Sequence, residues 1–490
     1  MFEAAELGHE LSKSQFKRIE PKLRADLLDA QFDLSKNGKF PVVILISGVR
    51  GAGKGETVNL LNEWMDPRHI HTHAFDNPSD EERERPYMWR FWQKLPPKGR
   101  IGILFGSWYT APIIERVFKQ NSAKDLLRSV SEINRFERML ADEGALVLKF
   151  WFHLSKKRQK KRLKALAADR ETKWRVTERD WDFFKLYDRF YEISENVLRD
   201  TSTAHAPWIV VEGTDPRYRS VTVGKALLDA LRRRLKAPAP VSPSAPILRA
   251  VDKVNALSRL DLNRRIDPRD YKKAIEKHQR RLGLATRHPA FRDHNVVCVF
   301  EGMDAAGKGG AIRRITAAVD ARLYHTIPIA APTDEERAQP YLWRFWRHVP
   351  RKGRITMYDR SWYGRVLVER IEGFCGEADW LRAYSEINAF EEQLARNGAI
   401  VAKYWLQISK EEQYRRFKER EKTRFKRFKI TSEDWRNRDK WDQYQVAAAD
   451  MIERTSTAHA PWILIEANDK HFARAKILQT LADSIEQALQ

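Results

Sequence analysis

The sequence predicts an α/β protein made of two copies of one domain, each a parallel sheet with helices on both faces. Three observations predict this fold. Sequence blocks recur at a constant offset of 254 residues, apolar β-branched runs alternate with amphipathic helical segments, and a glycine-rich turn follows the first apolar run of each copy. Short buried strands separated by helices are typical of a three-layer α/β domain.

The duplication is visible in the residues themselves. Residues 78–100 and 332–354 match at 15 of 23 positions, and TSTAHAPW at 201–208 recurs unchanged at 455–462. Blocks so far apart that share one offset indicate a tandem repeat. The segment 236–247 contains four prolines. We therefore predict domains at 1–235 and 248–490, joined at 236–247 by an extended linker.

Each copy begins with a predicted helix and then a strand. Amphipathic patterns place these helices around Phe16–Leu34 and Tyr271–Arg287, and apolar runs place the first strands at Pro41–Ile46 and Val296–Phe300. Later apolar runs of the second copy predict strands at Ile355–Tyr358, Ile400–Leu406 and Trp462–Ile465.

Composition excludes several classes of protein. The 490 residues are 42% hydrophobic and 32% charged, which suits two folded domains and argues against a disordered or membrane protein. No apolar run reaches the roughly 18 residues of a spanning helix, and no signal peptide is recognisable. Two cysteines, Cys298 and Cys375, exclude a disulfide framework, so we expect a cytoplasmic protein.

The net charge is the most informative total. Lys and Arg number 90 against 67 Asp and Glu, a formal charge of +23. Such an excess predicts a polyanionic partner, which could be nucleic acid, an anionic membrane surface or a phosphate-rich substrate. A basic solvated surface is the alternative interpretation.

A phosphate-binding loop follows the first strand of the second copy. GMDAAGKG at 302–309 has the P-loop spacing and lies between a predicted strand and a predicted helix. Its backbone N–H groups, the helix N-terminus and Lys308 would all attract phosphate oxygens. The loop residues expected to contact phosphate are Gly302, Ala305, Ala306, Gly307, Gly309 and Gly310.

The loop departs from the usual motif at one position. Gly309 stands where a Ser or Thr normally holds Mg²⁺, so another oxygen must bind the cation. Two candidates are Asp304, inside the loop, and Asp359, at the end of the strand Ile355–Tyr358 and followed by Arg360.

The first copy lacks these groups. Its loop, GVRGAGKG at 48–55, has Arg50 in place of Asp304, and Phe105–Gly106 replaces the Asp359–Arg360 pair. We therefore predict that the first copy is catalytically inactive, although it could still hold an anion.

A basic segment of the second copy predicts a lid. Residues 418–429 carry a local charge of +5, whereas the matching residues 164–175 carry +2. Lids of kinases lie after the same helix and close over the transferring phosphate. A solvated helix face is the alternative. Arg365, replaced by Ala111 in the first copy, is a further candidate phosphate contact.

Two features present in both copies are interpreted as structural. The aromatic cluster 341–346 recurs at 87–92, where the metal carboxylates are lost, which favours packing over base stacking. Glu369 and Arg370, which recur as Glu115 and Arg116, could be site residues, but we expect an ion pair between them.

Taken together, GMDAAGKGG, PTDEERAQPYLWRFW, YDRSWYGRVLVER and RFKEREKT resemble the second family of polyphosphate kinases, from about Val296 to the C-terminus and more loosely over the first copy. The tandem arrangement is similar to the family's two-domain branch, the polyphosphate:AMP phosphotransferases. The resemblance implies a thymidylate-kinase-like P-loop fold with a helical lid, and transfer of a phosphoryl group from inorganic polyphosphate to AMP.

The resemblance also implies roles and partners. Asp304 and Asp359 would bind Mg²⁺, or Mn²⁺, while Lys308 and Arg360 would neutralise phosphate charge. Lid residues Lys418, Arg420 and Lys422 would contact the phosphate chain. Expected partners are polyphosphate and AMP or ADP, with no nucleic acid or membrane, in a homo-oligomer (dimer).

Three alternatives remain open at this point. ADP could be the acceptor, forming ATP. The donor could be ATP, although the absent Ser or Thr and the basic lid disfavour it. A non-catalytic nucleic-acid-binding protein would explain the charge but not carboxylates at the loop of one copy only.

Overall fold

The computed structural model describes residues 1–237, 255–424, 428 and 430–490. Two compact units are present, unit 1 built mainly from the first repeat and unit 2 mainly from the second. The short segment Ser79–Trp89 groups with unit 2, and Asp334–Pro340 groups with unit 1. Most of the predicted linker 236–247 lies outside the described residues, so the domain boundaries stay a prediction.

Each repeat forms a parallel sheet, as the sequence predicts, and each sheet has five strands. The strand order is β2-β3-β1-β4-β5 in the first repeat and, in the same sense, β7-β8-β6-β9-β10 in the second. The strands of the first repeat are β1 Val42–Gly48, β2 Ile70–Ala74, β3 Ile101–Phe105, β4 Leu146–His153 and β5 Trp208–Glu212. Those of the second are β6 Asn295–Gly302, β7 Tyr324–Pro328, β8 Ile355–Asp359, β9 Ala399–Gln407 and β10 Trp462–Glu466.

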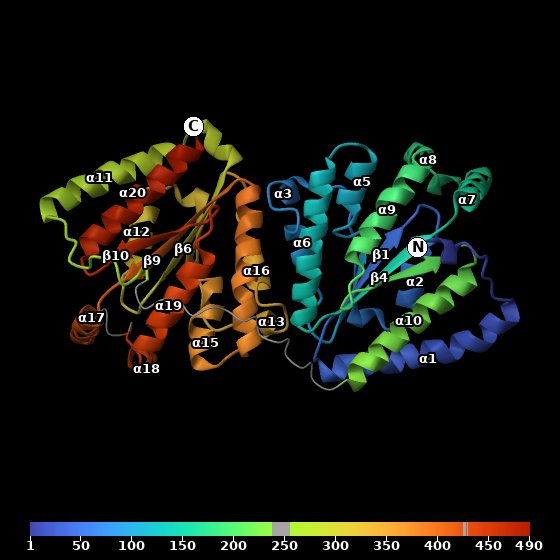
Figure 1. The fold of residues 1–490 in the computed structure, drawn as a ribbon, viewed down its shortest axis with the longest axis horizontal. Coiled ribbons are helices and arrows are strands. Elements are labelled where there is room, and N and C mark those ends of the chain that lie inside the picture. Colours follow the sequence, from blue (N-terminus) through green and yellow to red (C-terminus); the bar gives the residue numbers. More distant parts are fainter. Residues whose placement is uncertain (238–254, 425–427, 429) are drawn as a thin grey trace. The chain divides into compact units, whose positions relative to one another are not determined.

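Helices cover both faces of each sheet (Figure 1). The helices of the first repeat are α1 Lys13–Asn37, α2 Lys54–Trp64, α3 Asp80–Arg83, α4 Trp89–Trp92, α5 Thr110–Val117, α6 Ala123–Asp142, α7 Lys156–Ala168, α8 Glu178–Lys185, α9 Tyr187–Thr201 and α10 Pro216–Lys236. Those of the second are α11 Pro268–Ala285, α12 Lys308–Thr316, α13 Asp334–Arg337, α14 Trp343–Trp346, α15 Val368–Glu372, α16 Glu377–Arg396, α17 Lys410–Lys422, α18 Ser432–Asp439, α19 Trp441–Thr455 and α20 Lys470–Ala488.

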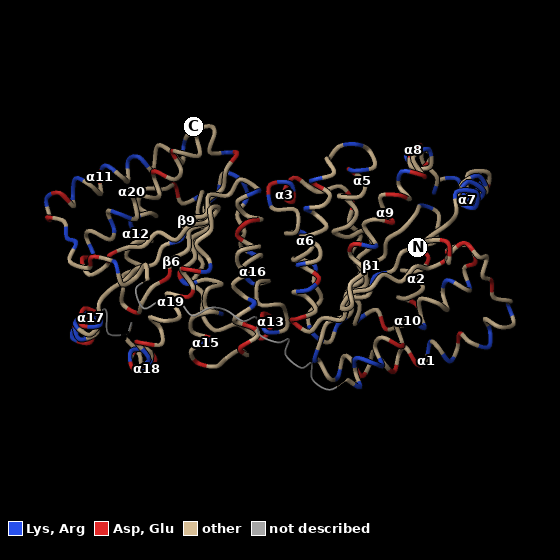
Figure 2. The backbone as a smooth tube through the Cα atoms, in the orientation of Figure 1, with Lys and Arg blue, Asp and Glu red and all other residues tan. Residues whose placement is uncertain are grey.

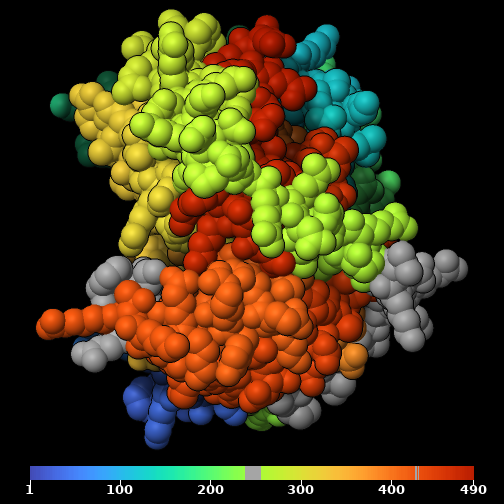
Figure 3. All heavy atoms as spheres, turned by 90° about the vertical axis from the view of Figure 1, so that its left-hand side faces the viewer, coloured from blue at the N-terminus to red at the C-terminus, as the bar shows by residue number. Residues whose placement is uncertain are grey.

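In unit 2, α11, α12 and α20 form one helical layer, and α15, α16 and α19 form the other (Figure 1). Figure 3 shows one face of unit 2, where atoms of α11, α20 and the α17 region lie at the surface. The central strand β6 is buried from Asn295 to Glu301, and Cys298 is fully buried there as part of the core. Among the described residues, no helix is long and apolar enough to cross a membrane.

A buried polar network in each repeat explains why several sequence blocks recur. Lys403 Nζ donates to Glu391 Oε2 at 2.7 Å, to Tyr363 Oη at 2.8 Å and to the carbonyl of Thr455 at 2.7 Å. Lys149 makes the same three contacts in the first repeat. A buried charge is tolerated only when it is paired and hydrogen-bonded, so this shared network is structural.

The aromatic cluster 341–346 is packing, as predicted. Phe345 and Trp346 are almost fully buried, and Trp346 lies 4.8 Å from the ring of Phe390. The expected Glu369–Arg370 ion pair is wrong. Arg370 pairs with Asp450 at 2.7 Å and Glu369 with Arg365 at 2.8 Å, because neighbouring residues on a helix point in different directions.

Candidate functional site

The phosphate loop of the second repeat lies at the carboxyl end of the central strand. Strand β6 ends at Gly302, and α12 begins at Lys308. A Cβ at Gly302 would lie 2.5 Å from the Leu406 carbonyl oxygen, so only glycine fits there. Strands β8 and β9 flank β6 on opposite sides, and ligands of open α/β sheets bind at such a switch point.

Lys308 curls back over the loop. Its Nζ donates to the carbonyl oxygen of Gly302 at 2.7 Å. Burial and then the nearby Arg360 guanidinium lower the pKa of Lys308, and the carboxylates Asp304, Asp359 and Glu301 counteract this. The ammonium group is thus held beside three acidic side chains, ready to exchange a carbonyl partner for a phosphate oxygen.

Asp304 is fixed by two side chains from distant segments. Its Oδ1 accepts from Arg360 Nη2 at 3.0 Å, and its Oδ2 accepts from Asn437 Nδ2 at 2.9 Å. Burial opposes its ionisation, but Lys308 and Arg360 outweigh burial and lower the pKa of Asp304. The carboxylate is therefore charged at neutral pH.

Asp359 presents an open carboxylate at the end of β8. Among the described residues, its side chain makes no hydrogen bond or ion pair. A Cβ at Gly309 would lie 3.8 Å from its Oδ2. The carboxylate thus lies beside the position where a P-loop Ser or Thr would stand, and can supply the oxygen that the sequence lacks there.

Arg360 and Ala305 adopt left-handed backbone conformations, with φ of 64° and 63°. The matching residues of the first repeat, Gly106 and Gly51, adopt φ of 78° and 79°. Non-glycine residues at such φ cost roughly 1–2 kcal/mol each. The second repeat bears this cost at two positions beside its loop, as strained functional sites often do.

A pocket opens beside the loop. Of the predicted site residues, Gly302, Asp304 and Arg360 line it, whereas Lys308 and Asp359 do not. The remaining lining residues were not predicted, namely Glu301, Met303, Gly364, Leu367, Val368, Trp405, Gln413, Asn437 and Tyr444.

Glu301 is the most informative of the residues that the sequence analysis missed. Its Oε1 accepts from Ser361 Oγ at 2.8 Å, and burial raises its pKa. The first repeat has Ser47 at this position. The same comparison of copies that identified Asp304 and Asp359 could have identified Glu301.

The donor set fits a hard divalent cation. Asp304 and Asp359 offer carboxylate oxygens beside the phosphate loop. Among the described residues, no group of three or more His, Cys, Asp or Glu is placed to hold a metal alone. Mg²⁺ usually binds through one or two carboxylates plus water and substrate phosphates, so two are sufficient.

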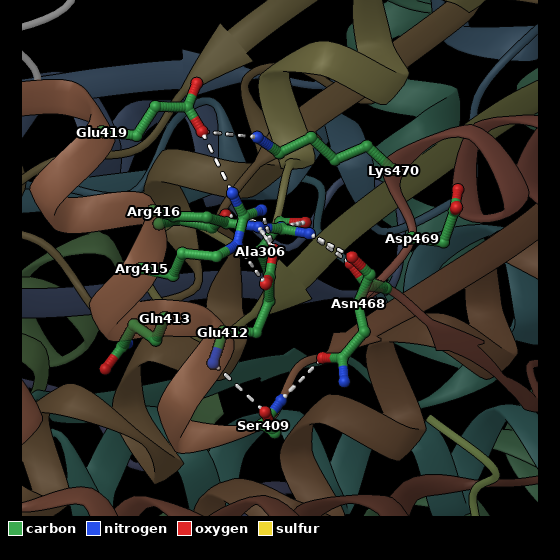
Figure 4. A network of polar contacts seen from close by, with 12 residues as sticks. Ala306, Ser409, Glu412, Gln413, Arg415, Arg416, Glu419, Asn468, Asp469 and Lys470 are labelled. Carbon is green, nitrogen blue, oxygen red and sulfur yellow. Dashed lines mark hydrogen bonds and ion pairs between the residues drawn. The ribbon is translucent and has the colours of Figure 1, made fainter. Parts of the chain in front are cut away.

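Arg416 braces the loop from behind (Figure 4). Its Nη1 donates to the carbonyls of Ala305 and Ala306, both at 2.9 Å, and its Nη2 to those of Ala467 and Asn468 at 2.6 and 2.9 Å. The side chain is 2% exposed. Arg416 links α17 to the loop, and the sequence analysis did not predict this role.

Other predicted contacts lie outside the pocket lining. Arg365 pairs with Glu369, and its guanidinium lies 4.3 Å from the Tyr341 ring centroid. On α17, Lys418 pairs with Glu421 at 3.0 Å. Neither Lys418, Arg420, Lys422 nor Arg365 lines the pocket. Residues 425–427 and 429 of the predicted basic lid fall outside the described part of the chain.

The first repeat keeps the loop but fills the site differently. Arg50 Nη1 donates to Asp180 Oδ1 at 2.6 Å, and its guanidinium lies 4.5 Å from the Phe183 ring centroid. Phe183 occupies the position of Asn437. Burial, and then Arg50, lower the pKa of Lys54 to about 7. An arginine salt bridge thus replaces the carboxylate pocket.

Comparisons with known proteins cover both repeats. A family model described as polyphosphate kinase 2 matches residues 10–238 and again 265–490. A polyphosphate:AMP phosphotransferase from Pseudomonas aeruginosa is 58% identical over all of this chain and 99% of that protein. One from Acinetobacter johnsonii is 40% identical over 94% and 95% of the two chains. A crystal structure described as polyphosphate kinase 2 from Pseudomonas aeruginosa has a TM-score of 0.90 at 56% identity, and covers 100% of this chain and 99% of that one.

Proposed function

Since the chain belongs to the polyphosphate kinase 2 family, we propose that its second repeat transfers a phosphoryl group from inorganic polyphosphate to AMP, forming ADP. Full-length relatives named polyphosphate:AMP phosphotransferase support this reaction. The observation that carries the assignment to the second repeat is the open carboxylate of Asp359 beside the loop that holds Asp304, Lys308 and Arg360. The first repeat has none of these except the lysine, Lys54.

The reaction needs positioning and charge neutralisation more than covalent chemistry. Loop amides and the N-terminus of α12 would hold phosphate oxygens, and Lys308 and Arg360 would neutralise charge as it shifts between donor and acceptor. The attacking phosphate oxygen of AMP is already ionised at neutral pH, so no protein base has to remove a proton. Glu301, hydrogen-bonded to Ser361, would keep Lys308 and Arg360 charged.

Asp304 and Asp359 would hold Mg²⁺, or Mn²⁺ in its place. The bound cation would supply charge neutralisation across the phosphate oxygens. The hydrogen bonds from Asn437 and Arg360 would orient the Asp304 carboxylate. Arg416 would keep the loop carbonyls turned away from the pocket and the loop amides turned toward it.

ADP formation from AMP, Mg²⁺ and polyphosphate tests this proposal directly, with ATP as the donor in a parallel reaction. We expect ADP to form in the reaction with polyphosphate and not in the reaction with ATP. If ADP forms only in the reaction with ATP as the donor, the protein is a conventional nucleotide kinase. If ATP formation from ADP is faster than ADP formation from AMP, the acceptor assignment is wrong although the donor assignment stands.

Two expectations stay predictions. A homodimer is expected from the resemblance, and sedimentation of the purified chain tests it. Residence in the cytoplasm is the other, and fractionation of cells tests it.

A further inference from the structure

Helix α7 carries an unbalanced run of positive charge. Its 13 residues, KKRQKKRLKALAA, include seven Lys or Arg and no Asp or Glu. The matching helix α17, KEEQYRRFKEREK, has six basic and four acidic residues. Figure 2 shows α7 in blue and tan, whereas α17 is mixed blue and red. The repeat without the metal carboxylates therefore has the more basic helix.

The basic residues of α7 divide into three that form ion pairs and four that do not. Lys156, Arg158 and Arg162 pair with Asp188, Glu212 and Glu56, respectively. The other four, Lys157, Lys160, Lys161 and Lys164, are exposed and have no ion pair among the described residues. Their i, i+3, i+4, i+7 spacing places them on one face of the helix.

This lysine face (Lys157, Lys160, Lys161 and Lys164) lowers the stability of helix α7. Lys157 with Lys161 and Lys160 with Lys164 are like-charge i, i+4 pairs, which destabilise a helix. Basic residues in the first turn of a helix are also unfavourable, and the first turn of α7 has no acidic residue. An anionic ligand would relieve both effects.

Helix α7 lies against the phosphate loop of its own repeat. Gln159 Nε2 donates to the Arg50 carbonyl at 3.0 Å, and Arg162 reaches Glu56 in the first turn of α2. A Cβ at Gly51 would lie 3.5 Å from Cγ of Arg162. These contacts come from Gln159 and Arg162, on the side of α7 opposite the lysine face, so the lysine face is turned to solvent while the helix is anchored on the loop. That loop has a phosphate-binding backbone but no carboxylate pair for a metal.

We propose that the lysine face of α7 is a metal-independent docking site for the inorganic polyphosphate chain. A lysine side chain carries a compact positive charge on a flexible stem, which suits a linear polyanion that has no bases and no fixed geometry. The proposal rests on polyphosphate being the substrate. It gives the first repeat a function that its own loop chemistry does not supply, because a chain held at a second site leaves the protein more slowly.

The test measures equilibrium binding of fluorescently labelled long-chain polyphosphate to the full chain at about 0.1 M salt with EDTA and without nucleotide. The variant replaces Lys157, Lys160, Lys161 and Lys164 by Gln. We expect its Kd to rise about tenfold or more, with a shallower dependence of log Kd on log salt concentration. Replacing only Lys160 and Lys164 should give an intermediate Kd.

A matched control removes the same charge from the same unit. Lys13, Lys17, Arg18 and Lys22 on α1 are exposed and become Gln, and this variant should bind within about twofold of wild type. Equal affinity of the α7 and α1 variants for polyphosphate would overturn the proposal. Binding of single-stranded RNA is measured in the same way. If the α7 variant loses affinity for RNA but not for polyphosphate, the proposal is overturned in favour of a nucleic-acid site.

Formation of ADP from AMP and a short polyphosphate separates this proposal from the proposed function. The α7 variant should form ADP at the wild-type rate. If wild type forms no ADP, the proposed function fails, while the binding comparison still decides whether the lysine face holds polyphosphate.

Discussion

Replacing Arg360 by Gly and by Ala separates its backbone cost from its chemistry. Both substitutions remove the ion pair with Asp304, which contributes at most about 1 kcal/mol because the Arg360 side chain is 48% exposed. They differ in the backbone. At φ of 64°, Ala bears roughly 1–2 kcal/mol that Gly avoids, whereas Gly loses about 0.4–1 kcal/mol through the entropy of the unfolded chain.

We therefore expect Arg360→Gly to be more stable than Arg360→Ala by about 1 kcal/mol, the reverse of the order in an ordinary helix. Urea unfolding followed by fluorescence measures the difference between the two variants. Both should lower kcat for ADP formation equally, by about 10²–10³-fold, because each removes a cation aimed at the transferring phosphate.

Lys119 provides the control. It has φ of 61°, lies in the first repeat and matches Gly373 of the second. Lys119→Gly should likewise be more stable than Lys119→Ala, with full activity in both. The reasoning is refuted if Arg360→Ala is as stable as Arg360→Gly, or if either variant keeps more than a tenth of the wild-type kcat.

Three further predictions use the same contrasts between copies and neighbours. Asp359→Asn should lower ADP formation at least about 10²-fold, whereas Arg50→Ala in the first repeat should leave the rate unchanged; equal rates for the two variants would contradict the assignment to the second repeat. Arg416→Met, which strands buried loop carbonyls, should cost about 2–4 kcal/mol in urea unfolding, against less than about 1 for Arg415→Met, whose side chain is 61% exposed. The folded-state pKa of Lys54 is about 7, below its ordinary 10.5, so the unfolded chain binds more protons between these values and stability should rise with pH there. Lys54→Met should reduce that rise, and an undiminished rise would show that Lys54 is not its source.

The sequence was sufficient for the elements whose signal is local. The P-loop glycines, the central strands and the duplication all follow from short patterns. The edge strands β2 and β7 were missed because they are largely exposed and lack an apolar run. Comparing the copies singled out Asp359 as a candidate, since a carboxylate lost together with its neighbours predicts a lost function.

Contacts between residues that are far apart in the chain could not be predicted from the sequence. Asn437 lies 133 positions from Asp304 and Arg416 lies 111 from Ala305, and no local pattern reports such contacts. Glu301 was overlooked because a strand was expected to end there. Arg365 was assigned to phosphate on its charge and on its loss in the first copy, but charge alone did not reveal that Glu369 and Tyr341 engage it.

The two repeats have diverged in site chemistry while keeping the same internal frame. The Lys403 network and its counterpart around Lys149 agree in every partner, so the frame itself does not determine which repeat reacts. Differences lie in the loop and in the helix packed on it. The second repeat has carboxylates and an arginine at strained φ, whereas the first has an arginine salt bridge and the lysine face of α7. This pattern is expected if one copy performs the transfer and the other holds the chain that supplies it, because phosphoryl transfer needs acidic groups for a metal and chain binding needs only positive charge.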